Sequence, residues 1–186
     1  MTARLLLLLF FALASGCASL NQQQCLRGDW YGIGMADGRA GESAGRLNAH
    51  IRACAEYGVR IDEQRYFAGR SEGLKTYCRL ENAFATGLAG QRYQGVCPAE
   101  VDAAFAHYNN AAYAVYRTRQ DLDDLEDRIS DAELRLAASR DRDDRRRLRL
   151  YLDELDQHYD DLRFELRTNL HYLEYLQSEA DNPPRP

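Results

Sequence analysis

Three side chains in the first half of this chain could carry out acid–base chemistry. Asp37 is a carboxylate, His50 is an imidazole that changes charge near neutral pH, and Tyr77 is a phenol. Held together, they could serve a hydrolase in which the carboxylate or the imidazole acts as general base. An aspartate followed by a glycine, as here, is more common in a turn or a helix cap.

The serines give little support to nucleophilic catalysis. One common class of catalytic serine lies in the pattern G-x-S-x-G. That context is absent from the candidates Ser43, Ser71, Ser130, Ser139 and Ser178. We therefore predict that the chain is not an enzyme and assign no catalytic residue, with a hydrolase at Asp37, His50 and Tyr77 as the alternative.

Two histidines in the second half, His107 and His171, could form a metal or acid–base site. If the chain folds back near residue 140, positions whose numbers add up to about 280 face each other, and Glu100 and Glu174 come within reach. A ligand set with orienting partners is not visible, and such histidines are more often packing residues. We predict neither a metal nor a cofactor, and a site at the two histidines is the weaker alternative.

Arginines crowd the segment around residue 145. Because guanidinium groups match phosphate geometry, Arg145, Arg146 and Arg147 are candidates for contact with lipopolysaccharide, phospholipid or an acidic partner. Aspartates such as Asp141 and Asp144 lie among them. The alternative is therefore a solvated loop that neutralises its own charge.

Cys17 follows a short apolar run over residues 5–16, which Arg4 precedes. This pattern is typical of a secretory signal. The cysteine at its end resembles the lipobox of bacterial lipoproteins, in which a lipidated cysteine becomes the mature N-terminus. A membrane span would need about 20 apolar residues, so the alternative is an ordinary signal peptide without lipid.

This resemblance implies that the protein is attached to a membrane through lipid on Cys17. Ala18 follows the cysteine, and the sorting patterns of Gram-negative lipoproteins, which retain a protein in the inner membrane through an aspartate there, imply the outer membrane. The protein would face the periplasm. Without Arg4 the formal charge is −6, which argues against a dominant nucleic-acid function.

The other four cysteines are predicted to form two disulfides, because the periplasm is oxidising. They are Cys25, Cys54, Cys78 and Cys97. A four-cysteine zinc site needs paired short spacings such as C-x₂-C, whereas the gaps here are 29, 24 and 19 residues.

Glycine and proline divide the chain into two parts. Apart from the glycine of the signal, every glycine lies between Gly28 and Gly95, and no proline lies between Pro98 and Pro183. We predict a mainly α protein in which a small disulfide-linked module precedes a long antiparallel helical hairpin. The expected parts are a signal (1–16), a lipid-anchored linker (17–24), the module (25–97), the hairpin (98–179) and a disordered tail (180–186).

The hairpin prediction depends on periodicity. Apolar residues keep a heptad-like spacing from Val101 to Leu136, stop at a polar stretch over 139–144, and resume from Leu148 to Leu176. Each helix would be about 50–60 Å long at 1.5 Å per residue. A single hairpin leaves part of its seam uncovered, so we expect its base to pack on the module or its length on a second copy.

The module carries glycines at helical spacing. Gly34 and Gly38 would share one helix face, as would Gly69 and Gly73. Glycine costs about 1 kcal/mol per site in a helix relative to alanine. These stripes therefore predict the close approach of another backbone or of an aromatic ring.

A continuous first helix over 29–57 would separate Cys25 from Cys54 by about 40 Å. A disulfide requires Cα atoms within about 7 Å. We therefore predict the pairs Cys25–Cys78 and Cys54–Cys97, while crossed helices would allow Cys54–Cys78.

Cysteines, aromatic residues and glycines of the module occur together in a specific order. The order is Cys25, Trp30-Tyr31-x₂-Gly34-x₂-Asp37-Gly38-x₂-Gly41, His50-x₃-Cys54, Gly58-Val59, Tyr66-x₂-Gly69-x₃-Gly73-Leu74-x₂-Tyr77-Cys78, Gly87-x₂-Gly90 and Tyr93-x₃-Cys97-Pro98. Over residues 25 to 115 it resembles a family of bacterial lipoproteins labelled domain of unknown function 2799 (DUF2799). The resemblance implies an envelope lipoprotein and supplies no activity.

From these observations we expect a non-enzymatic structural or interaction protein of the bacterial cell envelope. Its hairpin would contact an envelope protein or a second copy of the chain. The alternative is an envelope enzyme, such as a cell-wall hydrolase, with its site in the N-terminal module.

Overall fold

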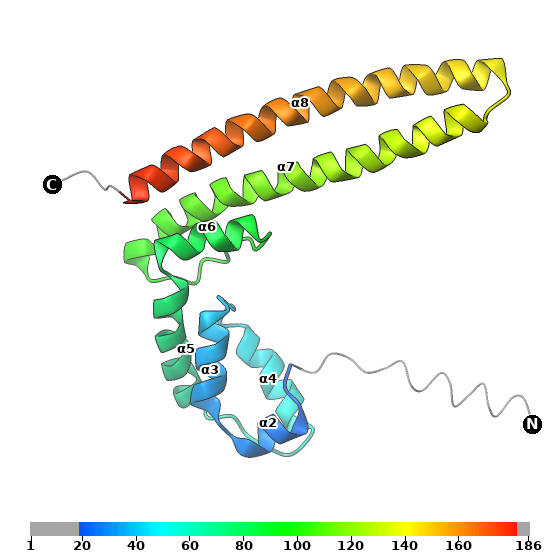
Figure 1. Ribbon diagram of the computed structural model, residues 1–186. Coiled ribbons are helices and arrows are strands. Elements are labelled where there is room, and N and C mark those ends of the chain that lie inside the picture. Colours follow the sequence, from blue (N-terminus) through cyan, green and yellow to red (C-terminus); the bar gives the residue numbers. More distant parts are fainter. Residues whose placement is uncertain (1–18, 182–186) are drawn as a thin grey trace, which may run out of the picture. The chain divides into compact units, whose positions relative to one another are not determined.

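The computed structural model describes residues 19–181, so the signal and Cys17 lie outside the described residues (Figure 1). Within this range the chain forms α-helices and no strand, which confirms the mainly α prediction. The chain divides after Tyr77 into two compact units. The predicted boundary at residue 97 was therefore too late. None of the helices in residues 19–181 is long and apolar enough to cross a membrane.

Four helices lie in residues 19–77, the described part of the first unit. They are α2 (Gln22–Arg27), α3 (Trp30–Arg39), α4 (Arg46–Ala55) and α5 (Glu63–Tyr77). The Asn21 side chain accepts from Gln24 N, and Asp29 accepts from Gly32 N, so α2 and α3 each begin at a side-chain cap. Asp62 does the same for α5 by accepting from Arg65 N.

The glycine stripes lie where α3 and α5 pack together. A Cβ atom on Gly34 would collide with the carbonyl oxygen of Tyr66, and one on Gly38 with that of Arg70. In the opposite direction, a Cβ on Gly69 would meet the carbonyl oxygen of Tyr31. The predicted close approach is confirmed, and its partner is backbone.

The expected continuous helix over 29–57 is wrong, because α3 ends at Arg39. Gly41 takes the left-handed conformation, with φ of 71°, and Glu42 N donates to Asp37 O. Together they make a left-handed glycine cap that turns the chain. Arg70 holds this turn by donating from Nε and Nη2 to the carbonyl oxygen of Glu42.

The predicted disulfide pairing is wrong for the same reason. Once the chain turns after α3, α4 returns toward α2, and Cys25 bonds to Cys54 with Cα atoms 5.4 Å apart. Cys78 bonds to Cys97 with Cα atoms 5.6 Å apart. Each unit therefore contains one disulfide, and the prediction that all four cysteines pair is confirmed.

The second unit contains α6 (Leu80–Leu88) and two long helices, α7 (Ala99–Ala138) and α8 (Arg142–Asp181). Helices α7 and α8 run side by side as the predicted antiparallel hairpin (Figure 1). Forty residues in each helix give about 60 Å at 1.5 Å per residue. Cross-hairpin bonds, such as Arg128 Nη2 to Tyr151 OH at 2.9 Å, show the register expected for a fold about residue 140.

The base of the hairpin is covered by α6, which packs on α7. The fully buried Asn109 side chain donates from Nδ2 to Ala83 O, Thr86 Oγ1 and Gln91 O. Its Oδ1 accepts from Tyr93 N at 2.8 Å. One amide thus joins α6 and the following loop to α7, which explains why residues 78–97 belong to the hairpin unit.

Candidate functional site

A chain of four hydrogen-bonded side chains lies in the first unit. Tyr66 OH donates to Asp37 Oδ2 at 2.7 Å, and His50 Nε2 lies 2.8 Å from the same oxygen. On the other side of the ring, His50 Nδ1 lies 2.8 Å from Ser19 Oγ. The order is therefore Tyr66, Asp37, His50, Ser19.

The elements of the unit explain how these residues meet. The glycine contact between α3 and α5 places Tyr66 beside Asp37. The turn after α3 brings α4, and with it His50, back toward Asp37. Ser19 enters from the segment before α2, where the next residue, Leu20, is buried in the core against Trp30 and other apolar side chains.

Burial differs among the four hydrogen-bonded side chains. Tyr66 is 0% exposed and His50 is 2% exposed. The Asp37 side chain is 15% exposed, and Ser19 is half-buried. Burial, followed by the hydrogen bond to Asp37, raises the pKa of the Tyr66 hydroxyl well above its ordinary value near 10. Tyr66 therefore keeps its proton and acts as a donor.

The network assigns the proton on the His50 ring. Asp37 Oδ2 accepts from Tyr66, and an ionised carboxylate only accepts, so His50 Nε2 carries the hydrogen that points at Asp37. In the neutral imidazole the other nitrogen, Nδ1, is then the acceptor. Ser19 Oγ, which faces it, is the donor of the last hydrogen bond.

Only part of this site was predicted from the sequence. Asp37 and His50 are brought together as the hydrolase alternative requires, but Tyr77 is not with them. The Tyr77 ring packs against Gly41, where a Cβ would collide with it. Tyr66 and Ser19 were missed: the glycine spacing after Tyr66 was a usable signal, whereas Ser19 gave none.

Residues 29–114 match the model of a family described as a protein of unknown function, DUF2799. This match supports the DUF2799 family label for that region of the chain. The expected family is thus confirmed, with limits close to those inferred from residues 25 to 115. No curated protein and no solved structure matches the chain.

The DUF2799 region contains three members of the hydrogen-bonded chain, Asp37, His50 and Tyr66, while Ser19 precedes it. It also spans α3 to α6 and the first part of α7. The distal part of the hairpin lies outside the matched region.

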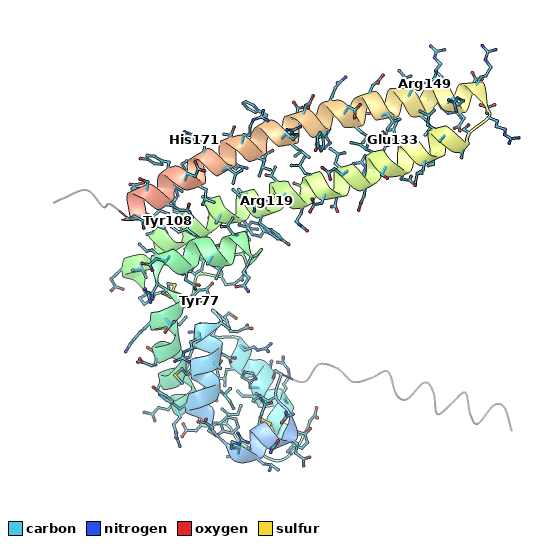
Figure 2. All side chains as sticks on the ribbon, viewed as in Figure 1. Tyr77, Tyr108, Arg119, Glu133, Arg149 and His171 are labelled. Atoms are coloured by element: carbon cyan, nitrogen blue, oxygen red, sulfur yellow. A yellow bond between two sulfur atoms is a disulfide. The ribbon has the colours of Figure 1, made fainter. Side chains whose placement is uncertain are left out.

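The two histidines of the hairpin do not form the pair considered from the sequence. His107 Nε2 lies 3.2 Å from Tyr172 OH, so the neighbour of His171 takes the facing position. Figure 2 shows His171 on α8 and Tyr108 on α7, towards the base of the hairpin. Among residues 19–181, no group of three or more His, Cys, Asp or Glu side chains is placed to hold a metal ion.

The arginines near the hairpin turn differ in their contacts. Arg145 Nη1 donates to Leu136 O at 2.6 Å and to Ser139 O at 3.1 Å, so it caps the end of α7. Arg147 pairs with Asp144 at 3.2 Å. Arg146 is exposed. Of the three candidates for phosphate contact, Arg145 thus has a structural role.

An open pocket of about 600 Å³ lies at the base of the hairpin unit. It is lined by the first half of α6, including Leu80 and Phe84, by Val101 of α7, and by the C-terminal end of α8. Charged residues at its rim, Arg79 and Glu81, pair with each other at 3.5 Å. The pocket offers a mixed surface without a cluster of catalytic groups.

Proposed function

We propose that this protein is a bacterial lipoprotein, anchored in the outer membrane through lipid on Cys17 and facing the periplasm, and that its hairpin binds a helix of an envelope protein. The role of the hairpin is binding rather than catalysis. Two features support this proposal, the attachment of the N-terminal segment and the outer face of α8.

The segment after Cys17 is held firmly to the first unit. Ser19 bonds to His50, and Leu20 is 5% exposed within the core. The Cys25–Cys54 disulfide follows directly after. A lipid on Cys17 would therefore be two residues from a fixed point, so the first unit would be held at the membrane surface.

The observation that carries the binding proposal is an apolar stripe on α8, made of Leu150, Phe164 and Tyr175. These side chains are 62%, 66% and 60% exposed. They are 14 and 11 residues apart, close to four and three turns at about 3.6 residues per turn. They therefore lie on one face, and the buried residues Leu148, Leu155 and Leu162 lie on the opposite one.

A stripe of large apolar side chains at whole-turn spacing suits a helical partner. Ridges of one helix pack into grooves of another, with contacts that recur every three or four residues. Charges of both signs flank the stripe, such as Asp153 and Arg167, which can fix the direction of the partner. Self-association through the same face is the competing outcome.

A photoreactive phenylalanine analogue at Phe164, in intact cells, tests this proposal. We expect crosslinking to one envelope protein, and none from the matched position Asp156, which is exposed on the flank of α8. Crosslinks at Phe164 only to a second copy would replace the partner with a dimer. Equal and unspecific capture from both positions would contradict the proposal.

A further inference from the structure

One member of the hydrogen-bonded chain in the first unit, Ser19, is not explained by attachment of the N-terminal segment alone. A residue that only fastened the N-terminal segment would need a hydrogen bond and burial. Ser19 has the hydrogen bond but is only half-buried, whereas the groups behind it, His50 and Tyr66, are almost completely enclosed. The reactive end of the network is thus the end that faces solvent.

We propose that Ser19 is the nucleophile of an acyl-transfer site, with His50 as its general base and Asp37 as the residue that positions the ring. A serine, an imidazole and a carboxylate in this order form the arrangement of serine hydrolases, which is recognised by geometry and not by position in the chain. The distances of 2.8 Å on both sides of the ring satisfy it.

The direction of each hydrogen bond fits the proposed roles. Tyr66 and His50 both donate to Asp37 Oδ2, so the lone pair of His50 Nδ1 is turned to Ser19. A base in this tautomer can take the proton of the Ser19 hydroxyl as the oxygen attacks. Here Nδ1, and not Nε2, is the ring nitrogen that accepts the serine proton. The proton transfer itself is the same with either nitrogen.

A further donor lies on the same helix as His50. Arg46 is four residues before His50 on α4, and residues at this spacing share a helix face. Its Nε is buried and has no hydrogen-bond partner among the described residues. A buried donor without a partner is costly, so we take Arg46 as the candidate residue of α4 to support negative charge that develops on a substrate oxygen.

The reaction is hydrolysis of a carboxylic ester. Ser19 Oγ attacks the carbonyl carbon, its proton passes to His50 Nδ1, and the carbonyl oxygen becomes the oxyanion. The C–O bond to the alcohol then breaks, and the alcohol leaves with the proton from His50. Water, deprotonated by His50, cleaves the acyl-serine to the acid and restores Ser19. If the protein is anchored through Cys17 as proposed, lipid acyl esters are the substrates within reach.

The test uses the full chain in detergent, treated with a fluorophosphonate that reacts with activated serines. We expect stoichiometric labelling at Ser19, identified by peptide mass spectrometry, and none at the exposed Ser43. His50→Gln should slow labelling at least about 100-fold, as loss of a general base does. Asp37→Asn should slow it less.

Variant folding is checked by the Cys25–Cys54 disulfide and by helix content. Two results would overturn the proposal: no labelling of Ser19 in the folded wild-type protein, or labelling of folded His50→Gln at the wild-type rate. The first needs no variant at all. Neither result bears on the crosslinking at Phe164, so the two proposals fail independently.

Discussion

The carbonyl oxygen of Tyr66 lies where a Cβ atom on Gly34 would have to be. The same relation holds in reverse between Tyr31 and Gly69. Helices α3 and α5 thus touch backbone to backbone, and this contact sets the position of the Tyr66 hydroxyl beside Asp37. Packing of the first unit and assembly of its polar site depend on the same glycines.

Gly34→Ala is therefore expected to lower the free energy of unfolding of the first unit by at least about 3 kcal/mol, because the added methyl meets backbone that cannot move aside. Urea denaturation measures the loss. Gly45→Ala is the control, since the nearest atom to its Cβ would be Ser43 Oγ at 3.5 Å. Equal stability of the two variants would contradict the helix contact.

Asn109→Ala should destabilise the hairpin unit by at least about 2 kcal/mol, because it leaves the buried carbonyl oxygen of Ala83 and the partly buried Tyr93 N without their partner. Hydrogen exchange should show α6 losing protection before the rest of α7. Asn110→Ala provides a matched control at an exposed neighbour. A small effect at both positions would show that α6 is held by its apolar contacts alone.

The hairpin could be predicted because its information is local and repeated. A seven-residue spacing such as Leu148, Leu155 and Leu162 specifies one helix face whatever the rest of the chain does. Both helix ends were also visible, at Pro98 and at the polar stretch over 139–144.

The first unit was harder to predict because its fold depends on a single turn, the one that ends α3. Gly41 lies in a run with Gly34 and Gly38 at helical spacing, and the sequence does not show which of them ends the helix. The structure shows that the helix ends before Gly41, because Gly41 is left-handed and Glu42 N donates to Asp37 O. The disulfide pairing and the contact of His50 with Ser19 both depend on that turn. A prediction that misses the turn therefore also misses the pairing and the site.

Tyr93 provides a pH-dependent prediction. Burial, and then the hydrogen bond to Asp102, raise the pKa of its hydroxyl to about 12, against about 10 for tyrosine in an unfolded chain. The folded protein therefore holds this proton more tightly than the unfolded one. The resulting stability is complete below pH 10 and is lost as the pH rises toward 12.

The measurement compares the free energy of unfolding of wild type and Tyr93→Phe from pH 8 to pH 12. We expect the advantage of wild type to shrink above pH 10. Tyr57→Phe, at an exposed position, is the control for general alkaline effects. A constant difference between wild type and Tyr93→Phe across this range would contradict the raised pKa.

Arg145→Ala should loosen the hairpin turn, because its guanidinium satisfies the carbonyl oxygens of Leu136 and Ser139 at the end of α7. We expect a local loss of about 1–2 kcal/mol, measured by hydrogen exchange in the last turn of α7. Arg146→Ala changes an exposed side chain and should leave exchange unaltered.

The difference between these arginines also changes how phosphate binding at the turn must be tested. Reversing Arg145, Arg146 and Arg147 together to glutamate would disturb the turn itself, and lost binding would then have two explanations. Arg146→Glu alone keeps the cap of α7 and the Arg147–Asp144 pair. If the exposed arginines contact anionic lipid, this variant should weaken binding to phosphatidylglycerol vesicles with exchange at the turn unchanged. Unaltered vesicle binding would assign the arginines to the structure and solubility of the turn.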